Sequence, residues 1–272
     1  MYNLLKGKKG LIFGALNDRS IAWRAALRAH DEGADLVLSN TALSLRMGQI
    51  NQLADICSAK VIAADATNMD ELNALVDQTT EHFGGKIDFV LHSIGMSPNV
   101  RKNVPYEDIN YAFMQKTIDI SALSFHKIMN ALYNKDAMAD GGSIVALTYI
   151  AGERAFPGYS DMADAKAMLE SIARSFGLKY GPKCGVRVNT VSQSPTLTTA
   201  GEGIAGMSAM YKYAQRISPL GNASADDLAD YLVTLFSDLT RKVTMQNLYH
   251  DGGYSATGLT EEVLEAFTRG LE

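Results

Sequence analysis

Cysteine is scarce in this chain of 272 residues, which contains only Cys57 and Cys184. The two lie far apart in the sequence and form no CxxC pair, so the chain lacks the framework of a disulfide-stabilised fold. This usage fits a reducing compartment. The five histidines show no spacing typical of metal ligands, and we expect no metal.

Long apolar runs and an excess of positive charge are also missing. No segment approaches the roughly 20 apolar residues of a membrane helix, and the first ten residues are too poor in apolar side chains for a signal peptide. The formal net charge is −5, whereas surfaces that bind nucleic acid are basic. We therefore expect a cytoplasmic protein that binds neither membrane nor nucleic acid.

The glycine-rich phosphate-binding fingerprint GxGxxG is absent as well. The first predicted strand is followed by Gly14, and Ser20 begins the next predicted helix. Free N–H groups and a hydroxyl at a helix start can bind a phosphate. A glycine followed by a serine cap is also a common turn, so these residues alone leave both interpretations open.

Strand and helix patterns alternate along the chain. Short apolar runs predict seven strands, at residues 10–13, 36–38, 61–64, 89–91, 143–147, 186–191 and 245–250. Alternation of this kind predicts an α/β fold with a doubly wound, Rossmann-like parallel sheet covered on both faces. No linker divides the chain, so we expect one domain over residues 1–272. Residues 193–220 are expected to form an irregular, partly helical insertion.

Polar residues gather where the predicted strands end. Parallel sheets of this type bind ligands beyond the carboxyl ends of their strands, and Gly14, Asp65, Ser93 and the pair Thr148-Tyr149 fall at such ends. Asp65 could accept a hydrogen bond from an adenine amino group, or it could only cap the next turn. The sequence thus predicts one edge of the sheet as the ligand site.

The most informative pattern is Tyr149, Tyr159 and Lys166, which follow the fifth strand. Seven residues make two helical turns, so a helix starting near Tyr159 would place its phenol and the Lys166 ammonium on one face. Two packed tyrosines and a solvated lysine are the plain alternative. Their place at the ligand edge favours proton-transfer chemistry beside a cofactor. His92, by contrast, is expected to be a buried, hydrogen-bonded residue.

These motifs resemble the short-chain dehydrogenase/reductase superfamily over nearly the whole chain, and within it the bacterial NADH-type enoyl-acyl-carrier-protein reductases. Ordinary superfamily members carry Tyr-x3-Lys, and this chain has Ala163 at that lysine position. The enoyl reductases carry Tyr-x6-Lys with a second tyrosine ten residues earlier. The match also includes G-x5-S-I-A from Gly14, H-S-I-G from His92, G-E-R-A-F-P-G-Y from Gly152, G-V-R-V-N from Gly185 and D-G-G from Asp251.

The resemblance implies NADH-dependent reduction of the trans-2 double bond of enoyl thioesters on acyl carrier protein, in type II fatty-acid synthesis, by a homotetramer. Tyr149, Tyr159 and Lys166 would be catalytic. Tyr159 would hydrogen-bond the enolate oxygen that develops on the thioester. Lys166 would hold the nicotinamide ribose and favour proton donation by the phenol. Tyr149 would either assist proton delivery or shape the pocket.

The resemblance also implies binding residues. The cofactor contacts would be Gly14, Ser20, Ile21, Thr41, Asp65, Ala66, Ser93, Ile94, Gly95, Lys166, Thr196, Leu197, Thr198, Thr199 and Ala200. The substrate contacts would be Ser97, Tyr159, Met162, Ile204 and Met207. A substrate-binding helix would lie between about Thr198 and Tyr213.

Two features bear on the cofactor. The family usually shows S-A-G-P-I where residues 192–196 read S-Q-S-P-T. Gln193 and Ser194 are bulkier than the alanine and glycine they replace, so either the loop path differs or the nicotinamide pocket is tighter. The second strand ends without a cation for a ribose phosphate, which favours NADH over NADPH unless Arg46 reaches back.

Two other functions stay open. One is a short-chain dehydrogenase/reductase that acts on a ketone or alcohol, against which the missing Tyr-x3-Lys weighs. The other is a non-catalytic nucleotide-binding homologue, against which the Tyr159 and Lys166 pair weighs.

Overall fold

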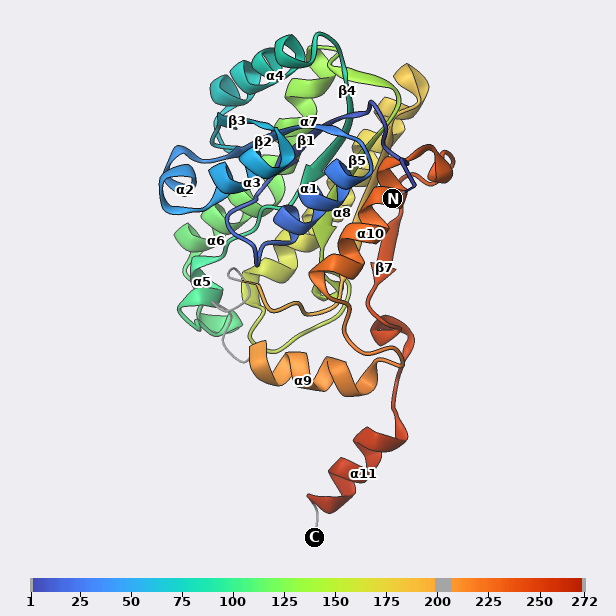
Figure 1. The fold of residues 1–272 in the computed structure, drawn as a ribbon. Coiled ribbons are helices and arrows are strands. Elements are labelled where there is room, and N and C mark those ends of the chain that lie inside the picture. The colour runs from blue at the N-terminus through green and yellow to red at the C-terminus, as the bar shows by residue number, and fades with distance from the viewer. Residues whose placement is uncertain (1, 199–206, 271–272) are drawn as a thin grey trace.

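The structure, a computed structural model, describes residues 2–198 and 207–270. Seven parallel strands form one sheet in the order β3-β2-β1-β4-β5-β6-β7, with helices on both faces (Figure 1). The strands are β1 (Lys9–Phe13), β2 (Asp35–Asn40), β3 (Lys60–Ala63), β4 (Ile87–His92), β5 (Met138–Thr148), β6 (Arg187–Gln193) and β7 (Asn247–His250). The order reverses between β1 and β4, so the predicted doubly wound, Rossmann-like sheet is confirmed.

The helices fill the connections between the strands. The α-helices are α1 (Ile21–Asp31), α2 (Ala42–Met47), α3 (Ile50–Cys57), α4 (Met69–Phe83), α5 (Pro98–Arg101), α6 (Tyr111–Ile118), α7 (Ser124–Asn134), α8 (Ser160–Cys184), α9 (Met207–Ile217), α10 (Ala225–Phe236) and α11 (Glu261–Arg269). Short 3₁₀ turns lie at η1 (Tyr106–Asp108), η3 (Ile150–Gly152), η5 (Asp238–Thr240) and η6 (Tyr254–Ala256), and a π turn forms η2 (Asp119–Leu123).

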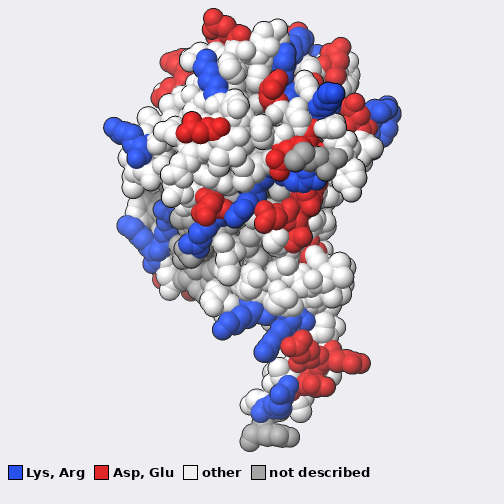
Figure 2. Space-filling model, viewed as in Figure 1, with Lys and Arg blue, Asp and Glu red and all other residues white. Residues whose placement is uncertain are grey.

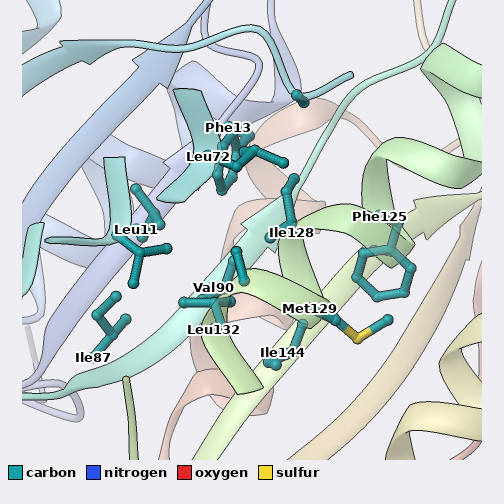
Figure 3. Close-up of a cluster of buried hydrophobic side chains, with 14 of the residues drawn as sticks. Leu11, Phe13, Leu72, Ile87, Val90, Phe125, Ile128, Met129, Leu132 and Ile144 are labelled. Carbon is teal, nitrogen blue, oxygen red and sulfur yellow. The ribbon is translucent and has the colours of Figure 1, made fainter. Parts of the chain in front are cut away.

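The core has one layer on each face of the sheet. Side chains alternate along a strand, so Leu11 and Phe13 of β1 enter one layer and Ile12 enters the other. The first layer packs β1, β4 and β5 against α4, α7 and α8 (Figure 3 shows part of it). The second packs the opposite face against α1, α3 and α10. Burial on both faces explains why the strands read as continuous apolar runs.

Two helices begin at residues whose side chains cap them. The Asn68 side chain accepts the N–H groups of Asp70 and Glu71 at 3.0 and 3.4 Å, as a capping residue does. Ser224 and Asp227 form a reciprocal capping box at the start of α10.

Other boundaries differ from the sequence-based expectation. Residues 106–132 do not form one continuous helix but are divided into η1, α6, the π turn η2 and α7, with Asn110 capping α6. The last strand starts at Asn247 rather than 245, because Met245 has a φ of +61° and leaves the extended conformation. The segment between β2 and β3 contains α2 and α3, which were not predicted.

The charged residues of both signs are intermingled on the face shown in Figure 2, without a large field of one sign. The helix α11 projects from the body at the C-terminal end of the described chain (Figure 1). Among the described helices, none is long and apolar enough to cross a membrane.

Candidate active site

A cavity of about 610 Å³ opens at the carboxyl ends of the strands. Most of the residues expected at the ligand site line it: Gly14, Ser20, Ile21, Thr41, Asp65, Ala66, Ser93, Ile94, Gly95, Ser97, Tyr149, Tyr159, Met162, Lys166, Thr196 and Thr198. Leu197 is 51% exposed and does not line the cavity. The expected contacts Thr199, Ala200, Ile204 and the side chain of Met207 lie outside the described residues.

Gly14 is required where β1 and β4 end side by side. Its φ is +97°, a conformation that favours glycine. A Cβ atom there would lie 2.1 Å from the Ser93 carbonyl oxygen, a distance that no side chain can adopt without a shift of the backbone. The absence of a side chain therefore brings the first βα turn and the Ser93 segment together at one rim of the cavity.

The Ser20 hydroxyl organises the turn before α1. It accepts the N–H groups of Leu16 and Asn17 at 3.2 and 3.1 Å, and it does not cap its own helix. Ser20 still lines the cavity. The hydrogen bonds of Ser20 are thus those of a residue that stabilises a turn. The start of α1, at Ile21, also lines the cavity.

Hydroxyl and amide groups surround the end of the cavity near β2 and β3. Asn40, Thr41 and Ser44 line it, and Arg46 does not. One carboxylate oxygen of Asp65 accepts the N–H and the hydroxyl of Thr67 at 2.8 and 2.7 Å. Asp65 therefore caps its turn, as one interpretation predicted, and because it also lines the cavity the adenine contact stays a prediction.

The two tyrosines lie together at the other end of the cavity. Tyr159 directly precedes α8, and its ring lies 5.1 Å from that of Tyr149. Both rings are only 8% exposed, and burial raises the pKa of both phenols above the ordinary value of 10. Both hydroxyls are therefore protonated donors at neutral pH. Among the described residues, the buried Tyr149 hydroxyl has no hydrogen-bond partner.

Lys166 lies on the second turn of α8 and donates to the Leu147 carbonyl at 2.8 Å. Burial lowers the pKa of its ammonium to about 8, and the nearby Glu170 carboxylate opposes that shift. A Cβ atom on Gly95 would lie 3.8 Å from the Lys166 nitrogen. Gly95 therefore lies beside the ammonium and places no side chain against it.

Asp161 supports the wall beside the tyrosines and was not predicted from the sequence. It is fully buried and accepts hydrogen bonds from Ser97, Asn99 and Thr117 at 2.6, 2.8 and 2.8 Å. These bonds join the α5 segment and α6 to the start of α8. No spacing pattern marks such a network, because its members meet only in the folded chain.

His92 is a buried, hydrogen-bonded residue, as predicted. Its Nε2 atom lies 2.8 Å from the Ser124 hydroxyl. Burial, helped by the charge on Lys166, lowers the pKa of His92 to about 3. The ring is therefore neutral at ordinary pH.

Several lining residues were not among the predicted contacts. Many are neighbours in sequence of predicted ones, whereas four come from the α6 to α7 region, to which the sequence assigned no ligand role. The lining residues that were not predicted as contacts are Phe13, Leu16, Asn40, Ser44, Ala64, Thr67, Met96, Val100, Arg101, Lys116, Asp119, Ile120, Ser124, Leu147, Thr148, Gln193, Ser194, Pro195 and Met210.

Comparison with known proteins places this geometry in a family. Residues 14–255 match the family described as enoyl-(acyl carrier protein) reductase. A relative from Rhizobium meliloti, enoyl-[acyl-carrier-protein] reductase [NADH] 2, is 35% identical over 95% of this chain and 96% of its own. The FabI enzyme of Bacillus cereus is 32% identical over 94% of this chain and 99% of its own.

A solved structure is closely similar. The crystal structure of a FabI–NADH complex from Alistipes finegoldii superimposes with a TM-score of 0.94 at 64% identity, over 95% of this chain and 92% of that one. The family match and the relatives extend over nearly the whole chain. The chain therefore belongs to the enoyl-(acyl carrier protein) reductase family.

Proposed function

We propose that this protein reduces the trans-2 double bond of enoyl thioesters on acyl carrier protein, with NADH as cofactor, in type II fatty-acid synthesis. The observation that carries the proposal is the convergence of Tyr149, Tyr159 and Lys166 on one cavity. The same cavity reaches the strand ends of β1, β2 and β3, as a dinucleotide requires.

The residues of the cavity fit NADH. Gly14 and Gly95 leave room that a side chain would fill. Asn40, Thr41 and Ser44 offer uncharged polar groups where the adenosine ribose would lie, and Arg46 lies outside the lining. None of the described residues that line the cavity near β2 and β3 is a cation that could meet a phosphate on that ribose, so the lining suits NADH better than NADPH. When bound, NADH supplies the hydride that the β-carbon of the thioester receives.

We assign Tyr159 as the donor to the thioester oxygen. Negative charge develops on that oxygen as the double bond is reduced, and a hydrogen-bond donor already in place stabilises it. Burial raises the pKa of Tyr159, which keeps the proton on the phenol and the group ready to donate. The neighbouring Tyr149 hydroxyl has no partner among the described residues, and it would either assist proton delivery or shape the pocket.

We assign Lys166 to the ribose next to the nicotinamide. Its ammonium lies in front of Gly95, and its bond to the Leu147 carbonyl fixes its direction. Ammonium donors to ribose hydroxyls form charge-assisted hydrogen bonds, which are stronger than neutral ones. The remaining predicted cofactor and substrate contacts of the cavity are part of the same proposal.

The proposal extends to the organisation of the protein. We propose one reductase domain over residues 1–272, in which the segment of about 193–220 is a substrate-binding insertion. We further propose a cytoplasmic homotetramer that binds neither nucleic acid nor membrane, as the family resemblance and the net charge of −5 suggest.

A turnover assay tests the proposal. The protein is mixed with NADH and either crotonyl or dodecenoyl thioester, and the loss of absorbance of the reduced cofactor is followed. We expect oxidation of NADH with enoyl thioesters. Oxidation with a 3-ketoacyl thioester and none with any enoyl thioester would assign the protein to the ketone-reducing branch of the superfamily instead.

A further inference from the structure

The side chain of Gln193 connects β6 to three other segments, which contain Thr196, Ala223 and His250. It is the last residue of β6, is 5% exposed and lines the cavity. Its Nε2 atom lies 3.2 Å from the Ala223 carbonyl oxygen and 3.3 Å from the Thr196 hydroxyl. Its Oε1 atom lies 2.8 Å from Nδ1 of His250.

These neighbours fix the orientation of the amide. The carbonyl oxygen of Ala223 can only accept a hydrogen bond, and so can that of Ser224 at 3.5 Å. The end of the Gln193 side chain that faces them must therefore be the NH₂ group. Its oxygen then faces His250, which donates from Nδ1.

The same network fixes the direction of the Thr196 hydroxyl. Thr196 accepts from the NH₂ group of Gln193, and its own proton points to the Ser194 carbonyl oxygen at 3.0 Å. The hydroxyl proton is thus used within the protein. What Thr196, a lining residue, can offer a ligand is an oxygen lone pair, which only accepts.

We infer that Gln193 is a positioning residue that holds the Thr196 oxygen as an acceptor for the amino group of the nicotinamide carboxamide. The inference rests on the proposed function and adds a specificity element to it. In the usual S-A-G-P-I pattern both positions carry apolar side chains. The paired amide and hydroxyl are therefore a feature in which this chain departs from that pattern.

A cofactor analogue without the amino group tests the inference. Dissociation constants are measured by fluorescence for NADH and for reduced 3-acetylpyridine adenine dinucleotide, which has a methyl group in place of the carboxamide NH₂. The unmodified protein should prefer NADH by about 3- to 10-fold, the value of one neutral hydrogen bond. Thr196→Val should abolish the preference for NADH, and Thr196→Ser should keep it. Gln193→Ala should reduce the ratio of the two dissociation constants to less than half of its value in the unmodified protein.

A matched control separates positioning from general loosening of the loops. The Asn222 side chain stabilises the same connection between α9 and α10, because its NH₂ group donates to the Tyr211 carbonyl oxygen at 2.8 Å. Neither Gln193 nor Thr196 is among its hydrogen-bond partners in the described part of the chain. Asn222→Ala should keep the preference for NADH. Thr196→Val keeps nearly the same volume, so it remains a test even where Gln193→Ala does not fold.

The outcomes distinguish this inference from the proposed function. If Gln193→Ala and Thr196→Val weaken the binding of NADH and of the analogue by the same factor, or leave the preference for NADH intact, Gln193 has only a structural role and the inference fails. If the unmodified protein prefers the analogue, the acceptor assignment is wrong. If it binds neither nicotinamide cofactor, the proposed function fails with it.

Discussion

Replacing Tyr159 by phenylalanine removes one oxygen atom and leaves the ring in place. The ring packs against Tyr149 in a buried cluster that also contains Tyr254, and the partly buried Phe156 packs against this cluster. Among the described residues, the structure gives the Tyr159 hydroxyl no hydrogen-bond partner, and the residue lines the cavity. The substitution should therefore change the free energy of unfolding by less than about 1 kcal/mol.

The effect on turnover should be much larger than the effect on stability. Removing one donor to a developing oxyanion typically lowers kcat by about 10²- to 10³-fold, which is about 2.7 to 4 kcal/mol of transition-state stabilisation. In the proposed mechanism the phenol would interact with the thioester and not with the adenosine end of the cavity. The dissociation constant of NADH should therefore stay within about twofold of the unmodified value.

The assay compares three proteins by NADH absorbance with crotonyl thioester as substrate, and their stability by urea unfolding. Tyr254→Phe is the matched control, because Tyr254 belongs to the same aromatic cluster, is equally buried at 8% exposure and does not line the cavity. It should keep nearly full turnover. The reasoning is refuted if Tyr159→Phe keeps more than a tenth of kcat, or if Tyr254→Phe loses as much.

Three further predictions concern Lys166, Gly14 and Asp161. Lys166→Ala should weaken NADH binding at least tenfold, because charge-assisted bonds are lost. Since burial lowers the pKa of Lys166 to about 8, the ammonium loses its proton as the pH rises through 8. The NADH dissociation constant of the unmodified protein should therefore rise between pH 7 and 9, whereas that of Lys166→Ala should stay constant. Gly14→Ala should lower the free energy of unfolding by more than about 2 kcal/mol in urea, because of the positive φ and the close Ser93 carbonyl; an unchanged midpoint would contradict this. Asp161→Ala leaves three buried donors without their acceptor and should cost about 2 to 4 kcal/mol by the same method. Its partly buried neighbour Asp164 should tolerate alanine with a change below about 0.5 kcal/mol.

The sheet could be predicted from the sequence because its strands are buried on both faces and read as apolar runs. The predicted ends of the strands were less accurate, because where a strand ends depends on its pairing with the neighbouring strand. The fifth strand was expected from residue 143, yet it starts at Met138, which pairs with Ile87 across a register shift. A pairing of this kind, interrupted by Gly141 and Gly142, leaves no periodic signal in the chain.

The short helices α2 and α3 were missed for a related reason. They are held by contacts that form only in the fold, such as the Thr41 side chain that caps α2 at the Ser44 N–H. On α3, Ile50 and Leu53 are buried against the sheet. Eight residues of α3 are too few for their periodicity to stand out.

The candidate site likewise contains some residues that the sequence could reveal and others that only the fold reveals. Tyr149, Tyr159 and Lys166 could be found because two are fixed by helical spacing and all follow one strand. Asp161 could not, although it lies two residues after Tyr159, because its three partners come from other segments. The sequence marked Gln193 as a departure but gave no direction for its side chain. The fold supplies that direction through Ala223 and His250.

The position of the transferred hydride is the most direct test of the central claim. NADH deuterated at the reactive position of the nicotinamide is used to reduce crotonyl thioester, and the product is examined by NMR. Reduction of the double bond through an enolate held by Tyr159 predicts deuterium on the β-carbon and a solvent proton on the α-carbon. Deuterium on the carbon bearing the thioester oxygen, or on no carbon of the product, would contradict the account.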